Sequence, residues 1–328
     1  MPVKKLTDLF DRTISYLRVS LTDQCNLRCI YCTPAPLSKL NQGELLTYEE
    51  LLRVIGICVD LGIKKVRLTG GEPLVRKNVG SFIQGLSGIS GLEDIRLTTN
   101  GVYLEEYCDL LYASGVRKLN ISLDTLKPER FAQITGAACF DKVWKGIERA
   151  CAKGFSPVKI NMVAMRGVND DELVDFARLA MERAVQVRYI EFMPIGNAAV
   201  WGKEKYIPSS EIMTRLQVLG TLEPVDQQQM DGPAKVYQIA GGRGSIGFIS
   251  PLSHKFCEKC NRLRLTSAGR LRSCLLSDKE NDLKTLLRQG ASDEEIAELV
   301  LQTIAAKPEG HKVTEGDSCH GRMSRIGG

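Results

Sequence analysis

The chain has 328 residues, enough for one large α/β domain with an appendage or for two domains. Its hydrophobic fraction of 43%, charged fraction of 25% and net charge of +5 are those of an ordinary globular protein and do not by themselves indicate nucleic-acid binding. No apolar run approaches the roughly 18 residues of a membrane-spanning helix. Residues 1–13 lack the apolar core of a signal peptide. We therefore expect a cytoplasmic protein.

The first part of the chain alternates strand-like with helix-like segments. Strands are expected at residues 15–22, 64–70, 93–100, 116–124, 157–164 and 187–193. A capping box of Thr47 and Glu50 opens one helix between them, and another helix begins near Asn169. β-then-α units in series predict an α/β fold with a parallel sheet, here an incomplete (β/α)6 barrel.

The two faces of these strands differ in chemistry. One face is aliphatic, as in Leu17 and Val19, and must meet the helices. The other face carries mainly cations, hydroxyls and amides, at Arg18, Ser20, Lys65, Arg67, Thr69, Arg96, Thr98, Asn120, Ser122, Lys159, Asn161, Tyr189, Glu191 and Met193. Several cations against Glu191 alone would be costly in a dry core. We expect a wet cavity for an anion, the alternative being misassigned strands or charges at exposed strand ends.

The alternation stops after Met193. A loop, a short helix from about Ser209 and two strands around a Gly-rich turn at residues 235–250 are expected. Ser292 and Glu295 form a capping box on the last helix. We expect residues 1–195 to form the partial barrel and residues 196–328 to form an α+β extension that covers its open side.

The first cysteine group follows the first strand. Cys25, Cys29 and Cys32 have the spacing C-x3-C-x2-C, with no histidine nearby. A structural zinc ion prefers four protein ligands. Three thiolates instead suit a cubane iron–sulfur cluster in which one iron stays open for another ligand. The group also lies at the C-terminal mouth of the strands, where α/β barrels carry their active sites.

The second group is formed by Cys257, Cys260 and Cys274, within a segment rich in cations. Arg262 and Arg264 alternate on a strand-like stretch, which suits a fork for phosphate or a purine. The alternatives are a solvated basic face, or a zinc site in a nucleic-acid-binding protein. The fourth zinc ligand would then be one of His254, His311, Cys319 and His320.

Two motifs together resemble the radical S-adenosylmethionine (radical SAM) superfamily. They are the C-x3-C-x2-C spacing, with Tyr31 before the third cysteine, and the turn Gly70–Gly71–Glu72–Pro73 after the second strand. The resemblance implies a 4Fe-4S cluster whose open iron binds the methionine part of SAM. Electron transfer then cleaves SAM to a 5′-deoxyadenosyl radical. Glycines in the turn let the backbone approach a ligand.

From about residue 14 to the end, the chain resembles the GTP 3′,8-cyclase (MoaA) family of molybdenum-cofactor biosynthesis. The further motifs are the second cysteine set, the Asn-Arg-x-Arg of residues 261–264 and the terminal double glycine. The resemblance implies a lyase that converts GTP to (8S)-3′,8-cyclo-7,8-dihydroguanosine 5′-triphosphate, with 5′-deoxyadenosine and methionine as by-products. It also implies a second 4Fe-4S cluster at Cys257, Cys260 and Cys274, whose open iron binds guanine.

The same resemblance assigns individual residues. The SAM contacts are Tyr31, Gly70, Gly71, Glu72, Ser122 and Met193. The GTP contacts are Arg18, Arg67, Thr98, Lys159, Arg262, Leu263 and Arg264. The catalytic set is Cys25, Cys29, Cys32, Arg18, Gly327 and Gly328, although composition alone would make the two glycines a frayed tail.

The partners implied are a flavodoxin or ferredoxin as electron donor, the next pathway enzyme (MoaC, cyclic pyranopterin monophosphate synthase) as product acceptor, and a second copy of the chain in a homodimer. No nucleic acid or membrane partner is expected. A radical enzyme acting on a peptide remains the alternative within the superfamily.

Overall fold

A computed structural model describes residues 6–32, 40–195, 202–226, 232–311 and 323–327. The expected first strands are all present, as β1 (Tyr16–Ser20), β2 (Lys65–Thr69), β3 (Asp94–Thr99), β4 (Lys118–Ser122), β5 (Val158–Ala164) and β6 (Val185–Glu191). Each pairs in parallel with the next. The outer helices are α1 (Tyr48–Asp60), α2 (Val79–Ser87), α3 (Leu104–Ala113), α4 (Pro128–Thr135), α5 (Phe140–Lys153) and α6 (Leu173–Glu182).

The C-terminal part extends this sheet at both edges. β9 (Ser245–Ile249) pairs in parallel with β6, and β10 (Arg262–Leu265) pairs in parallel with β1. Antiparallel strands complete the edges, namely β7 (Leu222–Pro224), β8 (Lys235–Ile239), β11 (Arg270–Arg272) and β12 (Asn281–Asp282). The sheet stays open, because its edge strands β7 and β12 do not pair with each other. The expected incomplete barrel with a C-terminal extension is confirmed.

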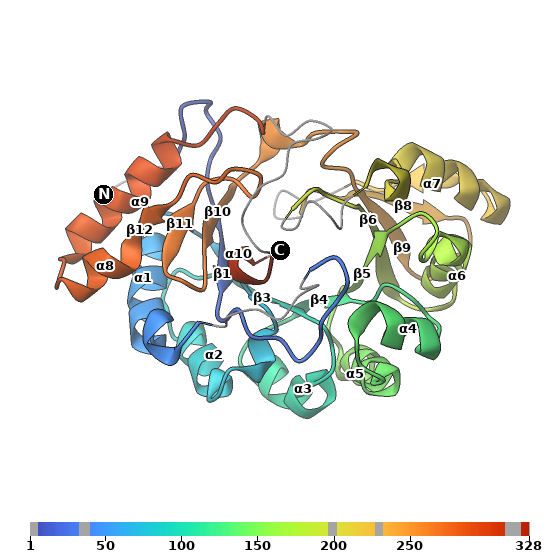
Figure 1. Cartoon of the computed structure of the whole chain (residues 1–328), viewed down its shortest axis with the longest axis horizontal. Coiled ribbons are helices and arrows are strands. Elements are labelled where there is room, and N and C mark those ends of the chain that lie inside the picture. Colours follow the sequence, from blue (N-terminus) through green and yellow to red (C-terminus); the bar gives the residue numbers. More distant parts are fainter. Residues whose placement is uncertain (1–5, 33–39, 196–201, 227–231, 312–322, 328) are drawn as a thin grey trace.

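The remaining helices are α7 (Ser209–Leu216), α8 (Leu283–Arg288), α9 (Asp293–Ala305) and α10 (Met323–Ile326). Figure 1 shows α1 to α6 on the outside of the curved sheet, with α10 on its inner side. Both capping boxes are confirmed: Thr47 with Glu50 at the start of α1, and Ser292 with Glu295 at the start of α9. None of the described helices is both long enough and apolar enough to cross a bilayer.

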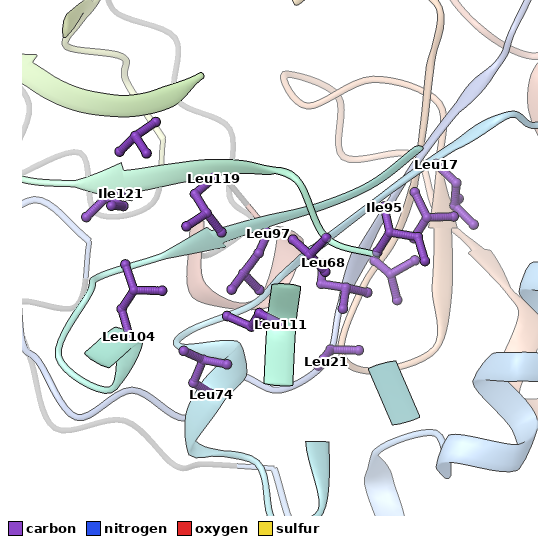
Figure 2. Close-up of a cluster of buried hydrophobic side chains, with 14 of the residues drawn as sticks. Leu17, Leu21, Leu68, Leu74, Ile95, Leu97, Leu104, Leu111, Leu119 and Ile121 are labelled. Atoms are coloured by element: carbon purple, nitrogen blue, oxygen red, sulfur yellow. The ribbon is translucent and has the colours of Figure 1, made fainter. Parts of the chain in front are cut away.

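The aliphatic strand face packs against the helices as expected. Leu17, Leu68, Leu97 and Leu119 are completely buried, and Figure 2 shows Leu97 close to Leu111 of α3. Burial of one such side chain contributes about 1.5–3 kcal/mol. This layer fixes the orientation of β1 to β5, so that their polar side chains point to the inner face of the sheet.

The prediction for β6 was wrong. Tyr189 and Glu191 were expected on the inner face, but Arg188 and Ile190 line the cavity instead. The Tyr189 ring stacks on Phe248, and its hydroxyl donates to the Leu173 carbonyl at 2.6 Å. Glu191 is buried where backbone and hydroxyl donors surround it, at Ser209, Leu252 and Ser253. Tertiary hydrogen bonds therefore override the hydrophobicity pattern at this strand.

Candidate active site

A cavity on the inner face of the sheet brings together most of the expected GTP contacts and the second cysteine group, whereas the first cysteine group and, apart from Met193, the expected SAM contacts do not line it. Arg18, Arg67, Thr98, Met193, Arg262 and Arg264 all line it, together with Cys257, Cys260 and Cys274. Lys159 is 2% exposed and lies on the same face of β5 as Asn161, which also lines the cavity. Leu263 lies between Arg262 and Arg264 in the sequence of β10. It is completely buried in the hydrophobic core, so its side chain points away from the cavity.

The first cysteine group forms a loop that is anchored at several points. The Leu27 N–H donates to Cys25 Sγ at 3.4 Å, and Asn100 Nδ2 donates to the same sulfur at 3.6 Å. The backbone N–H groups of Arg28 and Ile30 donate to the carbonyls of Thr135 and Ile134, at the end of α4. The backbone around the thiols is thus held in place by the protein itself.

The donor chemistry of this loop fits a cluster. Burial raises the pKa of Cys25 to about 11 and raises that of Cys29 well above its ordinary value. The thiols of Cys25 and Cys29 are therefore neutral at pH 7 unless a metal holds them as thiolates. A cubane cluster would place each of the three thiolates on a different iron.

Tyr31 is tied to a carboxylate that the sequence did not single out. Its hydroxyl donates to Asp124 Oδ2 at 2.7 Å, and the Val163 N–H donates to Asp124 Oδ1 at 2.8 Å. Burial raises the pKa of Asp124 to about 6. Asp124 follows β4 directly, near Ser122, which ends that strand. Its position after a parallel strand was the available signal, but one Asp at a strand end is too common to stand out.

The two glycines of the Gly70–Pro73 turn are needed for close contact with the cysteine loop. A Cβ on Gly71 would lie 2.2 Å from the Gln24 carbonyl oxygen, and one on Gly70 would lie 2.5 Å from that of Thr22. The Gly71 N–H donates to the Thr22 carbonyl at 2.7 Å. In this structure the contact that requires glycine is with the protein backbone.

Glu72 has its carboxylate turned into the protein. The side chain is 1% exposed and accepts hydrogen bonds from Thr99 Oγ1 at 2.8 Å, the Asn100 N–H at 2.6 Å and the Leu74 N–H at 3.1 Å. Burial raises the pKa of this carboxyl to about 7. The side chain therefore joins the turn after β2 to the loop after β3, and any contact of Glu72 with SAM falls to its backbone.

The second cysteine group lies in the cavity wall, among cations. Burial by itself would raise the pKa of Cys260, but the charges of Arg262 and Lys307 outweigh it and lower the pKa to about 6. The Cys257 carbonyl accepts from Arg12 Nη1 at 2.9 Å. Of the four candidate fourth ligands for zinc, His311 lines the cavity, while Cys319 and His320 lie outside the described residues.

The C-terminal tail reaches the cavity cations. The Gly327 carbonyl accepts from Arg264 Nη1 at 2.8 Å and from Arg18 Nε at 3.3 Å. Ile326 is buried against Ile195 and Leu276. Gly327 thus comes close to the residues expected to hold the substrate, whereas Gly328 lies outside the described part of the chain.

Six further residues line the same space, namely Tyr16, Lys65, Arg96, Asn120, Asn161 and Arg188. Strand alternation had placed Lys65, Arg96, Asn120 and Asn161 on the cavity face, although no individual role was assigned to them. Tyr16 was not assigned to a face, and its position two residues before Arg18 on β1 was the signal that could have found it. Arg188 was missed because the faces of β6 were assigned the wrong way round.

Two family profiles match the chain in succession. Residues 19–180 match the radical SAM superfamily, and residues 185–313 match the family described as Molybdenum Cofactor Synthesis C. Among solved structures, anSMEcpe with bound AdoMet has a TM-score of 0.60 at 15% identity over 92% of this chain and 82% of that one. Streptococcus suis SuiB bound to S-adenosylmethionine has a TM-score of 0.59 at 16% identity over 85% of this chain and 66% of that one. At 15% and 16% identity, these two matches show similarity of fold alone.

Curated relatives match over nearly the whole chain. A GTP 3′,8-cyclase from Thermodesulfovibrio yellowstonii is 48% identical over 98% of this chain and 100% of its own length. GTP 3′,8-cyclases from Moorella thermoacetica and Pelotomaculum thermopropionicum are 47% and 46% identical at the same coverage. The cysteine loop, the cation-lined cavity and these full-length matches lead to one conclusion: the chain belongs to the GTP 3′,8-cyclase family of the radical SAM superfamily.

Proposed function

We propose that this chain converts GTP to (8S)-3′,8-cyclo-7,8-dihydroguanosine 5′-triphosphate, the first step of molybdenum-cofactor biosynthesis. The observation that carries this conclusion is identity of up to 48% to relatives of that name over 98% of the chain. The reaction removes a hydrogen atom from ribose C3′ and joins C3′ to guanine C8. The resulting ring radical must then take up one electron, which the proposed second cluster would supply, and one proton to give the 7,8-dihydro product. Membership of the radical SAM superfamily implies a 4Fe-4S cluster and SAM, which together supply the radical that removes this hydrogen atom.

The residues of this chain bind and orient the reactants. We assign the first cluster to Cys25, Cys29 and Cys32, and the SAM contacts to Tyr31, Gly70, Gly71, Ser122 and Met193 with the backbone of Glu72. The cavity cations suit a triphosphate, because guanidinium groups bind phosphate oxygens in fixed geometry. Holding the ribose at the right distance from the radical source is the protein's main contribution to the rate.

We further propose a second 4Fe-4S cluster at Cys257, Cys260 and Cys274, with guanine bound against it. Support comes from the position of these thiols on the wall of the cavity that also holds Arg18 and Arg67. Arg262 and Arg264 lie beside them on β10 and would hold the nucleotide from that side. We also assign Gly327 and Gly328 to the catalytic set. Support for Gly327 comes from its carbonyl, which accepts hydrogen bonds from Arg18 and Arg264.

The remaining assignments are also proposals. A flavodoxin or ferredoxin would supply electrons, MoaC would accept the product, and the chain would act as a homodimer in the cytoplasm. The division at residue 195 would separate the part that binds SAM from the part that holds the second cluster. The zinc-dependent nucleic-acid binder loses its support, because Arg262 and Arg264 face the cavity and the full-length relatives are cyclases.

The test is anaerobic incubation of the reconstituted protein with dithionite, SAM and GTP. We expect 5′-deoxyadenosine and the cyclised nucleotide in equal amounts, and about eight irons per chain with matching acid-labile sulfide. Replacing Cys257, Cys260 and Cys274 by serine should leave about four irons and abolish the cyclised product. The matched control is Cys151→Ser, since that thiol lies on α5 away from the cavity. Full iron loading without either product would disprove the cyclase activity.

A further inference from the structure

Tyr16 stands in the cavity wall with no role assigned to it. It begins β1, is 4% exposed and lines the cavity beside Arg18. Arg67 Nε donates to the phenol oxygen at 2.5 Å, and the Arg18 side chain also hydrogen-bonds to the phenol. Lys65 Nζ lies 4.2 Å from the centre of the Tyr16 ring. The hydroxyl therefore serves as an acceptor for cationic donors.

The charges that face Tyr16 are positive on every strand packed against it. They are Arg18 on β1, Lys65 and Arg67 on β2, and Arg262 and Arg264 on β10. Arg96 on β3 lies next to Lys65. The nearby Asp94 carboxylate forms an ion pair with Arg96 at 2.5 Å. Burial acts to raise the pKa of Tyr16, but Arg67, Arg18 and Lys65 outweigh it and lower the pKa to about 7.

We propose that Tyr16 is an internal counter-anion that engages the substrate-binding cations in the empty enzyme and takes up a proton when GTP replaces it. This inference rests on the proposed function, because Arg18 and Arg67 are assigned there to GTP. The exchange is balanced: the guanidinium groups trade one phenolate oxygen for phosphate oxygens, and the phenolate takes one proton from solvent. The cations thereby keep an anionic partner before substrate arrives, which pre-forms the site.

The direction in which pH changes the GTP affinity follows from the charge of Tyr16 before and after GTP binds. In the empty enzyme Tyr16 is ionised above about pH 7, whereas a phenol without its cations has a pKa of 10.0. GTP binding should therefore take up about one proton between these pH values, and affinity should fall up to about tenfold per pH unit from this group. Lys65, whose pKa is lowered to about 8 by burial and by Arg96, acts in the same direction. The contribution of Tyr16 must thus be measured as a difference between variants.

The first experiment needs no GTP. The near-ultraviolet tyrosinate band of the anaerobically reconstituted protein is followed from pH 6 to 9, roughly the range around the expected ionisation. We expect one tyrosine to ionise near pH 7 in the wild type and in Tyr237→Phe, a half-buried tyrosine of β8, but not in Tyr16→Phe. Circular dichroism checks that Tyr16→Phe is folded. A wild-type titration identical to that of folded Tyr16→Phe overturns the inference.

The second experiment measures proton uptake by calorimetry of GTP binding in buffers of different ionisation enthalpy at about pH 8. Wild type should take up about one proton more per GTP than Tyr16→Phe, and Lys65→Arg should take up about one proton more than the double variant Tyr16→Phe/Lys65→Arg. GTP should also abolish the tyrosinate band. Tight GTP binding with the band retained, or with equal uptake in Tyr16→Phe, contradicts the inference while leaving the proposed function intact. A tyrosinate band in a folded protein that binds no GTP would contradict both the inference about Tyr16 and the proposed function.

Discussion

Asn100 connects the turn after β2 with the first cysteine of the cluster loop. Its backbone N–H donates to Glu72, and its side-chain Nδ2 donates to Asn26 Oδ1 at 2.8 Å and to Cys25 Sγ at 3.6 Å. The Val102 N–H donates to Asn100 Oδ1 at 3.1 Å, which fixes the orientation of the amide. One residue thus links the buried Glu72 carboxylate to the sulfur of Cys25, which we propose as a ligand of the first cluster.

Asn100→Ala should lower the reduction potential of the first cluster. Hydrogen bonds to the sulfurs stabilise the more negative, reduced cluster, so losing one disfavours electron uptake. A tenfold weaker reduction equilibrium would correspond to about 59 mV for one electron. The measurement is a redox titration followed by electron paramagnetic resonance. Iron content serves as the control for loading, and an unchanged potential at full loading would exclude this role of Asn100.

At the scale of elements, the segment before β1 is fastened to the loop of the second cysteine group by Arg12. This side chain is 7% exposed and pairs with Asp8 at 2.6 Å. Its Nη1 and Nη2 atoms donate to the carbonyls of Cys257 at 2.9 Å, Glu309 at 2.8 Å and Pro308 at 2.7 Å. The first residues of the chain thereby help to shape the wall that carries the second set of thiols.

Arg12→Met should destabilise the fold by about 3–5 kcal/mol, because it leaves the Asp8 carboxylate buried without its partner. We also expect the second cysteine group to lose iron, so that loading falls from about eight to about four irons per chain. Chemical denaturation and iron analysis measure the two effects. The matched control is Arg53→Met, whose ion pair with Asp293 is 40% and 62% exposed and should contribute less than about 1 kcal/mol. Equal effects of the two substitutions would rule out this role of Arg12 in anchoring the loop of the second cysteine group.

At the scale of the whole molecule, the C-terminal part of the chain extends both edges of the β1–β6 sheet, and α10 lies on the inner side of that sheet (Figure 1). β10 and β9 bring the C-terminal region against β1 and β6, and α10 then turns back toward β1. Gly327 has φ +76°, and a Cβ there would lie 2.5 Å from Thr69 Cγ2. The positive φ and this close approach therefore both favour glycine at position 327.

Gly327→Ala should displace the tail from Arg18 and Arg264. Misplacing a group by about 1 Å near a reacting centre costs about 100-fold in rate, so cyclised product should fall by roughly this factor. Gly290→Ala is the matched control, because Gly290 has φ +83° with nothing within 4 Å of an added Cβ. The control carries a similar backbone strain at a site away from the cavity. Initial rates of product formation compare the two, and similar rates would argue against a role for the tail.

Sequence patterns that act over a few residues predicted most of the fold and much of the site. Strand alternation located β1 to β6, and the capping boxes located α1 and α9. The inward cations Arg18 and Arg67 followed from the same alternation, since successive side chains of a strand point to opposite faces. Cysteine spacing singled out both thiol groups as candidate cluster ligands, and the structure places the second group on the cavity wall.

Tertiary structure alone decided what depends on contacts between distant residues. The faces of β6 are opposite to those predicted because Glu191 is held by donors at Ser209, Leu252 and Ser253. The anchoring role of Arg12 depends on carbonyl groups more than 200 positions away in the chain. The acceptor role of Tyr16 likewise requires Arg67 of the neighbouring strand. Periodicity encodes which side of a strand is apolar, but the hydrogen-bond and charge partners of a buried polar group are set by long-range packing and leave no local pattern.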